Sequence, residues 1–140
     1  MGSPASVFGH SFLRLNSAAN SLIDAGVSFE ADPGRNLNIS YIVKGLIGSF
    51  PGVFSQQPYF VKVNAYNNME SRDLWEYDLA LNSEQIDRMM NHLWELSNTH
   101  FNYYFLNGNC SYHILSLLEV AQPEWDFQPQ FKFWAIPLDT

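Results

Sequence analysis

The chain contains a single cysteine, Cys110, which excludes an internal disulfide bond and a cysteine-rich zinc site. It has only seven Lys and Arg residues against fourteen Asp and Glu residues, and its net charge of −7 makes nucleic acid and anionic membrane surfaces poor partners. The sequence has no apolar run of about 18 residues, no secretory signal, no Gly-rich phosphate loop and no metal-ligand motif. We therefore expect neither a cofactor nor a bound metal.

What the chain has in quantity is apolar and aromatic residues, at 46% and 16% of its composition, which is typical of a globular domain. Its 140 residues are enough for one domain with its own core. Met1-Gly2-Ser3 is typical of a cloning remnant, and an apolar segment follows almost at once. We therefore expect residues 4–140 to be a single domain excised from a longer protein, whose flanking regions would carry any signal peptide or membrane anchor.

The spacing of apolar residues predicts strands first and helices later. The segments are strands over 7–15, 24–31, 74–81 and 101–106, weak alternation over 59–66, a Gly- and Pro-rich loop over 48–58, helices over about 83–97 and from Cys110 to Ala121, and a strand-like tail over 131–138. Residues 37–47 fit either a strand or a helix. This order favours an α+β packing of layers over a parallel βαβ sheet.

Cys110 lies where a thiol could become reactive. Asn107-Gly108-Asn109 is a turn that ends in a good helix cap, so a helix should begin at or next to Cys110. The partial positive charge and unpaired N–H groups of a helix N-terminus lower a thiol pKa. The alternative, which the sequence leaves equally open, is an inert cysteine buried in the core.

A nucleophilic thiol needs a base, and the best candidate is His10, in the strand-like segment Phe8-Gly9-His10-Ser11-Phe12. The alternative is a histidine that only fills the core or a sheet edge. His113 lies three residues after Cys110 and could pair with it or supply half of a metal site. One helix gives such a pair poor geometry for a substrate, so we expect His113 to be a surface residue, like His92 and His100.

The residue that orients His10 should come from the strand 24–31, which we expect to pair with the strand of His10. The polar face of that strand offers Asp24, Ser28 and Glu30, unless all three face water. Asn109 and Ser111 flank the thiol, and the N–H groups that follow Asn109 are suited to an oxyanion hole.

Four segments carry a resemblance that runs in order over nearly the whole chain. They are Phe8-Gly9-His10-Ser11-Phe12-Leu13-Arg14, then Lys44-Gly45-Leu46 with Phe50-Pro51-Gly52, then Arg72-Asp73-Leu74-Trp75-Glu76-Tyr77, and finally Asn109-Cys110-Ser111-Tyr112. Together they resemble the Lnb-type periplasmic domain of Gram-negative envelope proteins. The resemblance implies a permuted papain-like fold, similar to NlpC-type and lecithin:retinol acyltransferase-like proteins. In such a fold an antiparallel sheet packs against helices, and the histidine precedes the cysteine.

The resemblance also implies a function in the cell envelope. The namesake proteins are lipoprotein N-acyltransferases, so Cys110 would carry an acyl chain as a thioester, His10 would act as base, and the acceptor would be the α-amino group of a lipoprotein. Where members often have an Asn-aromatic pair, this chain has Ser28-Phe29. The expected partners are therefore a lipid or lipoprotein, with membrane association through flanking regions. Two alternatives remain, a peptidase or amidase acting on peptidoglycan peptides and a non-enzymatic envelope scaffold.

Overall fold

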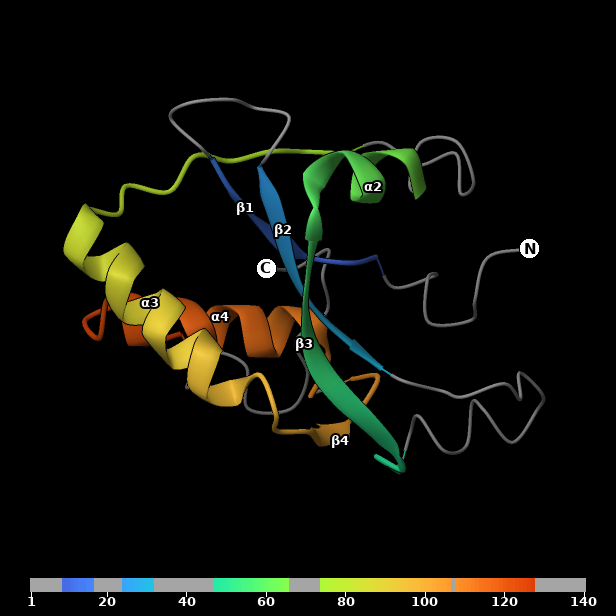
Figure 1. Ribbon diagram of the computed structural model, residues 1–140. Helices are drawn as coiled ribbons and strands as arrows, with labels where there is room; N and C mark the ends of the chain where they lie inside the picture. Colours follow the sequence, from blue (N-terminus) through green and yellow to red (C-terminus); the bar gives the residue numbers. More distant parts are fainter. Residues whose placement is uncertain (1–8, 17–23, 32–46, 66–73, 107, 128–140) are drawn as a thin grey trace.

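The computed structural model describes residues 9–16, 24–31, 47–65, 74–106 and 108–127. Its elements, in chain order, are β1 (Phe12–Leu15), β2 (Ala25–Ala31), β3 (Phe50–Pro58), α2 (Tyr59–Asn64), α3 (Ser83–Leu96), β4 (Phe101–Tyr103) and α4 (Cys110–Ala121). The four strands form one antiparallel sheet in the order β1-β2-β3-β4 (Figure 1). The expected α+β class is therefore confirmed, as is the pairing of the 24–31 strand with the strand that follows His10.

The two faces of β2 carry different chemistry. On one face, Val27 packs with Ile114 and Leu117 of α4, and α3 packs on α4 to complete this core (Figure 1). On the other face, Ser28 and its neighbours lie under the short helix α2, where Lys62 contacts them. The alternation of side chains along a strand thus separates an apolar layer, facing α4, from a polar layer, facing α2.

Residues 48–58, which the sequence predicts to be a loop, contain the longest strand of the described sheet, so that prediction is wrong. Pro51 is exposed in this strand, and Gly52 is needed there for packing, because a Cβ at Gly52 would lie 2.4 Å from Cζ of Phe29. The ring of Phe29 packs in an aromatic cluster with Phe50, Tyr103 and Phe105. Gly and Pro here serve close packing and a strand end rather than a turn.

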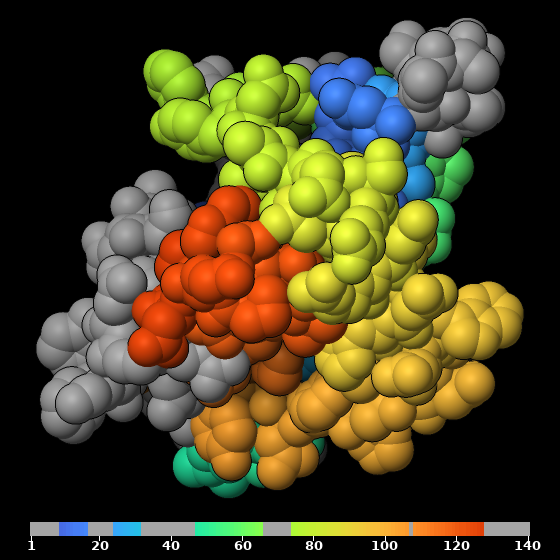
Figure 2. Space-filling model, turned by 90° about the vertical axis from the view of Figure 1, so that its left-hand side faces the viewer, coloured from blue at the N-terminus to red at the C-terminus, as the bar shows by residue number. Residues whose placement is uncertain are grey.

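Two further segments differ from their predictions. The weakly alternating residues 59–66 contain the helix α2, and residues 74–81 belong to no strand or helix. Trp75 and Tyr77 are 80% and 83% exposed. The segment 74–82 crosses the outside of the molecule between β1 and α3 (Figure 2), so its alternation of apolar and polar residues does not reflect a buried face.

Both predicted helices are confirmed. The helix α3 begins at a capping box, in which Asn82 and Gln85 exchange side-chain and backbone hydrogen bonds. Its residues Met89 and Leu93 are buried, whereas Trp94 is exposed. None of the helices in the described ranges is long and apolar enough to span a membrane.

The strand predicted over 7–15 is shorter in the structure, because His10 and Ser11 precede β1 and Gly9 has a positive φ of 83°. The predictions for residues 37–46 and for the tail 131–138 lie outside the described residues.

Candidate functional site

Cys110 is the first residue of α4, as the turn and cap residues predict. The Oδ1 atom of Asn109 accepts a hydrogen bond from the Tyr112 amide at 3.3 Å, and its Nδ2 donates to the Phe105 carbonyl at 2.9 Å. Asn109 is itself buried. These two bonds fix the start of α4 and hence the position of the thiol, while contact of Asn109 with a substrate stays a prediction.

The thiol of Cys110 lies in a buried, polar environment. Cys110 is only 2% exposed. Its sulfur accepts hydrogen bonds from the backbone N–H groups of Ser11 and Ser111 and from the side chains of Tyr103 and Ser111. Burial raises the pKa of the thiol above its ordinary value, and these hydrogen bonds offset only part of that rise. The sequence-based expectation of a lowered pKa is therefore wrong, because burial outweighs the effect of the helix N-terminus.

The segment that carries His10 lies against the start of α4. The hydroxyl groups of Ser11 and Ser111 are 2.9 Å apart and hydrogen-bonded, although the two residues are 100 positions apart in the chain. The Ser11 amide also reaches the sulfur of Cys110. The structure thus brings the residue next to His10 into contact with the thiol.

The imidazole of His10 lies beside Phe12 and Glu30. Its ring stacks on the Phe12 ring with a centroid distance of 6.3 Å, and its Nε2 atom is 4.0 Å from Oε1 of Glu30. Glu30 is therefore the candidate orienter that the structure brings to His10.

Glu30 belongs to a group that we name the Lys62 cluster, which consists of Ser28, Glu30, Ser55 and Lys62. The Ser28 hydroxyl donates to Oε1 of Glu30 at 2.6 Å, pairs with the Ser55 hydroxyl at 3.1 Å, and accepts from the Lys62 ammonium at 2.8 Å. The ammonium also forms an ion pair with Oε1 of Glu30. The possibility that Ser28 faces water is wrong, because Ser28 is fully buried.

The charge state of Glu30 follows from two opposing effects. Burial raises the pKa of its carboxyl group, but the hydrogen bonds from Lys62 and Ser28, together with the charges of Lys62 and His10, lower it by more. Glu30 is therefore an anion at neutral pH. Sequence reasoning missed Lys62, because in an alternating segment a lysine is expected to point to water and nothing local reveals a partner 32 residues away.

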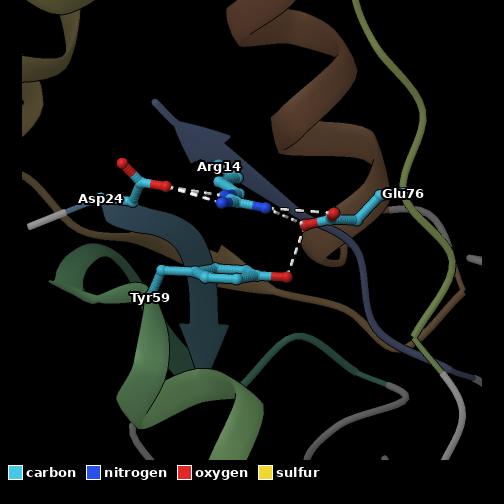
Figure 3. A network of polar contacts seen from close by, with 4 residues as sticks. All are labelled: Arg14, Asp24, Tyr59 and Glu76. Carbon is cyan, nitrogen blue, oxygen red and sulfur yellow. Dashed lines mark hydrogen bonds and ion pairs between the residues drawn. The ribbon is translucent and has the colours of Figure 1, made fainter. Parts of the chain in front are cut away.

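Asp24, the third candidate orienter, belongs to a separate group that we name the Arg14 cluster, formed by Arg14, Asp24, Tyr59 and Glu76 (Figure 3). Arg14 donates to the buried Asp24 from Nε at 3.0 Å and Nη2 at 2.7 Å, and to Glu76 from Nη1 at 3.0 and 3.1 Å. The guanidinium lies 4.3 Å from the centre of the Tyr59 ring, whose hydroxyl donates to Glu76. Asp24 thus binds Arg14, and Arg14 in turn binds Glu76 and anchors the 74–81 segment.

The prediction that His113 is a surface residue is wrong. Its ring lies 3.8 Å from the Phe29 ring, centre to centre, and also contacts Phe101 and Tyr112. Burial lowers its pKa to about 4, so His113 is neutral at neutral pH. His100 is exposed as expected, and His92 is partly exposed and pairs with Glu95 at 3.5 Å.

Within the described ranges, no three His, Cys, Asp or Glu side chains are grouped so that they could hold a metal ion. Searches of curated proteins and of solved structures gave no match to the chain. The Lnb N-terminal periplasmic domain family matches the chain over residues 1–140. The match covers the whole chain and agrees with the resemblance carried by the segments around His10 and Cys110. The chain therefore belongs to the Lnb N-terminal periplasmic domain family.

Proposed function

We propose that this periplasmic domain is a cysteine-dependent acyltransferase in which Cys110 is the nucleophile, His10 the base and Glu30 the residue that orients His10. One observation carries the proposal. The Cys110 sulfur contacts the amide of Ser11, the residue next to His10, while Nε2 of His10 lies 4.0 Å from Glu30. A nucleophile at a helix start, a base beside it and a carboxylate beside the base are the three parts that such a site needs.

The position of Glu30 assigns roles to the two imidazole nitrogens of His10. We assign the proton of the neutral ring to Nε2, which lies 4.0 Å from Oε1 of Glu30 and is not hydrogen-bonded to it, so that Nδ1 is the atom that accepts a proton. Because burial raises the pKa of Cys110, the resting thiol is neutral. The thiol therefore loses its proton to His10 as it attacks, which is general-base catalysis rather than attack by a preformed thiolate.

The reaction then has two balanced halves. In the first, the sulfur bonds to the acyl carbon of the donor as Nδ1 of His10 takes the thiol proton, and the leaving oxygen departs with that proton. This half yields a thioester on Cys110. In the second, an acceptor amine attacks the thioester carbon, His10 removes the amine proton, and the sulfur leaves and regains a proton. The N–H groups in the first turn of α4, at Cys110 and Ser111, are suited to stabilise the oxyanion in both halves.

The acyl donor and acceptor are part of the proposal and rest on the resemblance of the segments around His10 and Cys110. We infer that the donor is a lipid or lipoprotein of the envelope and that the acceptor is the α-amino group of a lipoprotein. We also infer the permuted papain-like fold, since the histidine precedes the cysteine and the cysteine opens a helix packed on an antiparallel sheet.

Intact-protein mass spectrometry tests the proposal after incubation with a p-nitrophenyl acyl ester in detergent micelles. The wild-type chain should gain one acyl group that hydroxylamine removes, Cys110→Ala should gain none, and His10→Ala should react at least about tenfold more slowly. Tyr104→Phe, which removes only a phenolic hydroxyl group, serves as a control. Acylation of Cys110→Ala at the wild-type rate would contradict the proposal. Ester hydrolysis without transfer to an added lipopeptide amine would favour the hydrolase instead.

A further inference from the structure

We propose that Lys62 is a positioning residue of this site. Its ammonium offsets the charge of Glu30, so that Glu30 can hold the His10 ring while His10 stays neutral and able to accept a proton. This inference rests on the proposed function, because it assigns a partner to the base of that reaction.

The first observation is that Lys62 is built into the fold rather than lying on its surface. It is 5% exposed, although it sits on a short helix whose neighbouring residues Phe60 and Val61 are exposed. Its aliphatic stem crosses Gly26, where an added Cβ would lie 3.2 Å from Cγ of Lys62. The lack of a side chain at Gly26 thus leaves the space through which the lysine reaches the polar face of β2.

The second observation is that Lys62 and His10 meet the same carboxylate oxygen. Oε1 of Glu30 accepts from the ammonium of Lys62 and from the hydroxyl of Ser28, and the same atom is 4.0 Å from Nε2 of His10. A buried ammonium is costly unless it is paired, and Glu30 supplies its counter-charge. The position of this oxygen is therefore set by Lys62 and Ser28, and Nε2 of His10 lies 4.0 Å from it, within reach of its charge but beyond hydrogen-bond distance.

The charge balance explains why a lysine is useful there. An isolated carboxylate within about 4–6 Å of an imidazole raises the imidazole pKa by one unit or more, and an imidazolium cannot accept the thiol proton. Among the residues that the structure describes, the charged and titratable groups near the His10 segment include Glu30 on β2, Lys62 on α2 and Cys110 on α4, while Arg14 on β1 is bound to Asp24 and Glu76. Lys62 is thus the cation that offsets Glu30.

A purely structural ion pair would also bury Lys62, so the test needs a readout that structure alone would not move. We would follow the titration of the four histidine rings by NMR in the 140-residue chain, and assign the His10 signal by its loss in His10→Ala. In Lys62→Met, which keeps the stem over Gly26, the His10 midpoint should rise by about one pH unit. In Glu30→Gln it should fall, whereas Lys62→Arg should stay near wild type.

Arg88→Met is the matched control, because it removes a cation whose partner, Glu84, is exposed on α3. This variant should leave the His10 midpoint unchanged. The acid limb of the acylation rate against pH should move upward in Lys62→Met together with the midpoint.

A His10 midpoint that is the same in wild type, Lys62→Met and Glu30→Gln would overturn the inference. If Lys62→Met does not fold, Glu30→Gln and Lys62→Arg still test the inference. A charge effect lowers the His10 midpoint in Glu30→Gln and leaves it near the wild-type value in Lys62→Arg. The failure of the proposed function has a separate signature, because it requires that His10→Ala leave acylation of Cys110 unchanged whatever the midpoint does.

Discussion

The Arg14 cluster and the Lys62 cluster lie on the same face of the sheet but bury their cations differently. The ring of Phe12 contacts Tyr59, which belongs to the Arg14 cluster, and His10, which lies beside Glu30 of the Lys62 cluster. Arg14 is partly exposed and binds two carboxylates, one buried and one exposed, whereas Lys62 is buried and binds a carboxylate that also faces His10. The first arrangement anchors a surface segment, and the second places a charge pair next to a proposed base.

The comparison also separates two reasons for burying a charge. Asp24 is buried where it holds β2 to Arg14 on β1 (Figure 3), and no member of the proposed dyad takes part in those bonds. Burial removes the Lys62 ammonium from water, and its ion-pair partner Glu30 lies beside His10. Stability measurements should show which cluster the fold depends on, and the predictions below begin with the largest expected effect.

The largest expected loss follows from Lys62→Met. The variant leaves the Glu30 carboxylate half-buried without its cation, which should reduce the free energy of unfolding by about 2–3 kcal/mol. Urea denaturation measures this loss, with Lys62→Arg as the control that keeps the charge. A loss below about 0.5 kcal/mol, the size expected for an exposed pair, would remove the distinction between the two clusters.

The next effect concerns pH and lies on the apolar face of β2. His113 has a folded-state pKa of about 4, below its ordinary value of 6.5, so the unfolded chain binds this proton first as the pH falls. The stability that depends on neutral His113 is complete above pH 6.5 and is lost as the pH falls toward 4. We expect a loss of about 2 kcal/mol over this window. In His113→Phe the free energy of unfolding, measured by urea titration, should change little between pH 6.5 and pH 4. The same pH dependence as in wild type would assign it to other groups.

Asp24→Asn should have a moderate effect. The neutral amide weakens two charge-assisted hydrogen bonds from Arg14, which keeps Glu76 as a second partner, so we expect a loss of about 1–2 kcal/mol. Thermal unfolding measures it, and Asp78→Asn, at an exposed position, is the matched control. The rate of Cys110 acylation should not change, and a slower rate would mean that the Arg14 cluster also serves the site.

Glu76→Gln should have the smallest effect, no more than about 0.5 kcal/mol at pH 7, because Glu76 is exposed. Hydrogen bonds from Tyr59 and Arg14 lower the pKa of Glu76, so its contribution is present above the unfolded-state pKa near 4.5 and is lost as the pH falls through the lower folded-state value. Thermal unfolding at pH 7 and pH 3 should therefore distinguish wild type from the variant only at pH 7. An equal difference at both pH values would contradict an ionic origin.

The sequence predicts features that depend on neighbouring residues. The cap at Asn82 and the apolar spacing locate α3, and Asn109 locates the start of α4 together with Cys110. The alternation over 24–31 locates β2 and its pairing with β1. Each of these signals lies within a few residues of the element that it predicts.

The features that the sequence does not reveal depend on distant partners. In the sequence, Gly52 indicates a loop, because the Phe29 ring that packs against it comes from another strand. Lys62 indicates an exposed face, because its partners Ser28 and Glu30 are also distant in the chain. The thiol pKa of Cys110 follows the same rule. A helix start argues for a lower value, but the burial that raises it comes from the packing of other segments around α4.

The most direct test of the central claim, that His10 is the base for Cys110, is the rate of Cys110 alkylation by iodoacetamide from pH 5 to 10 in wild type and His10→Ala. We predict that the wild-type rate rises with an inflection that reports the imidazole and that His10→Ala removes this inflection and slows alkylation at pH 7 by at least about tenfold. Identical profiles, with a single inflection above the ordinary thiol pKa in both proteins, would contradict the claim and make Cys110 a buried core residue.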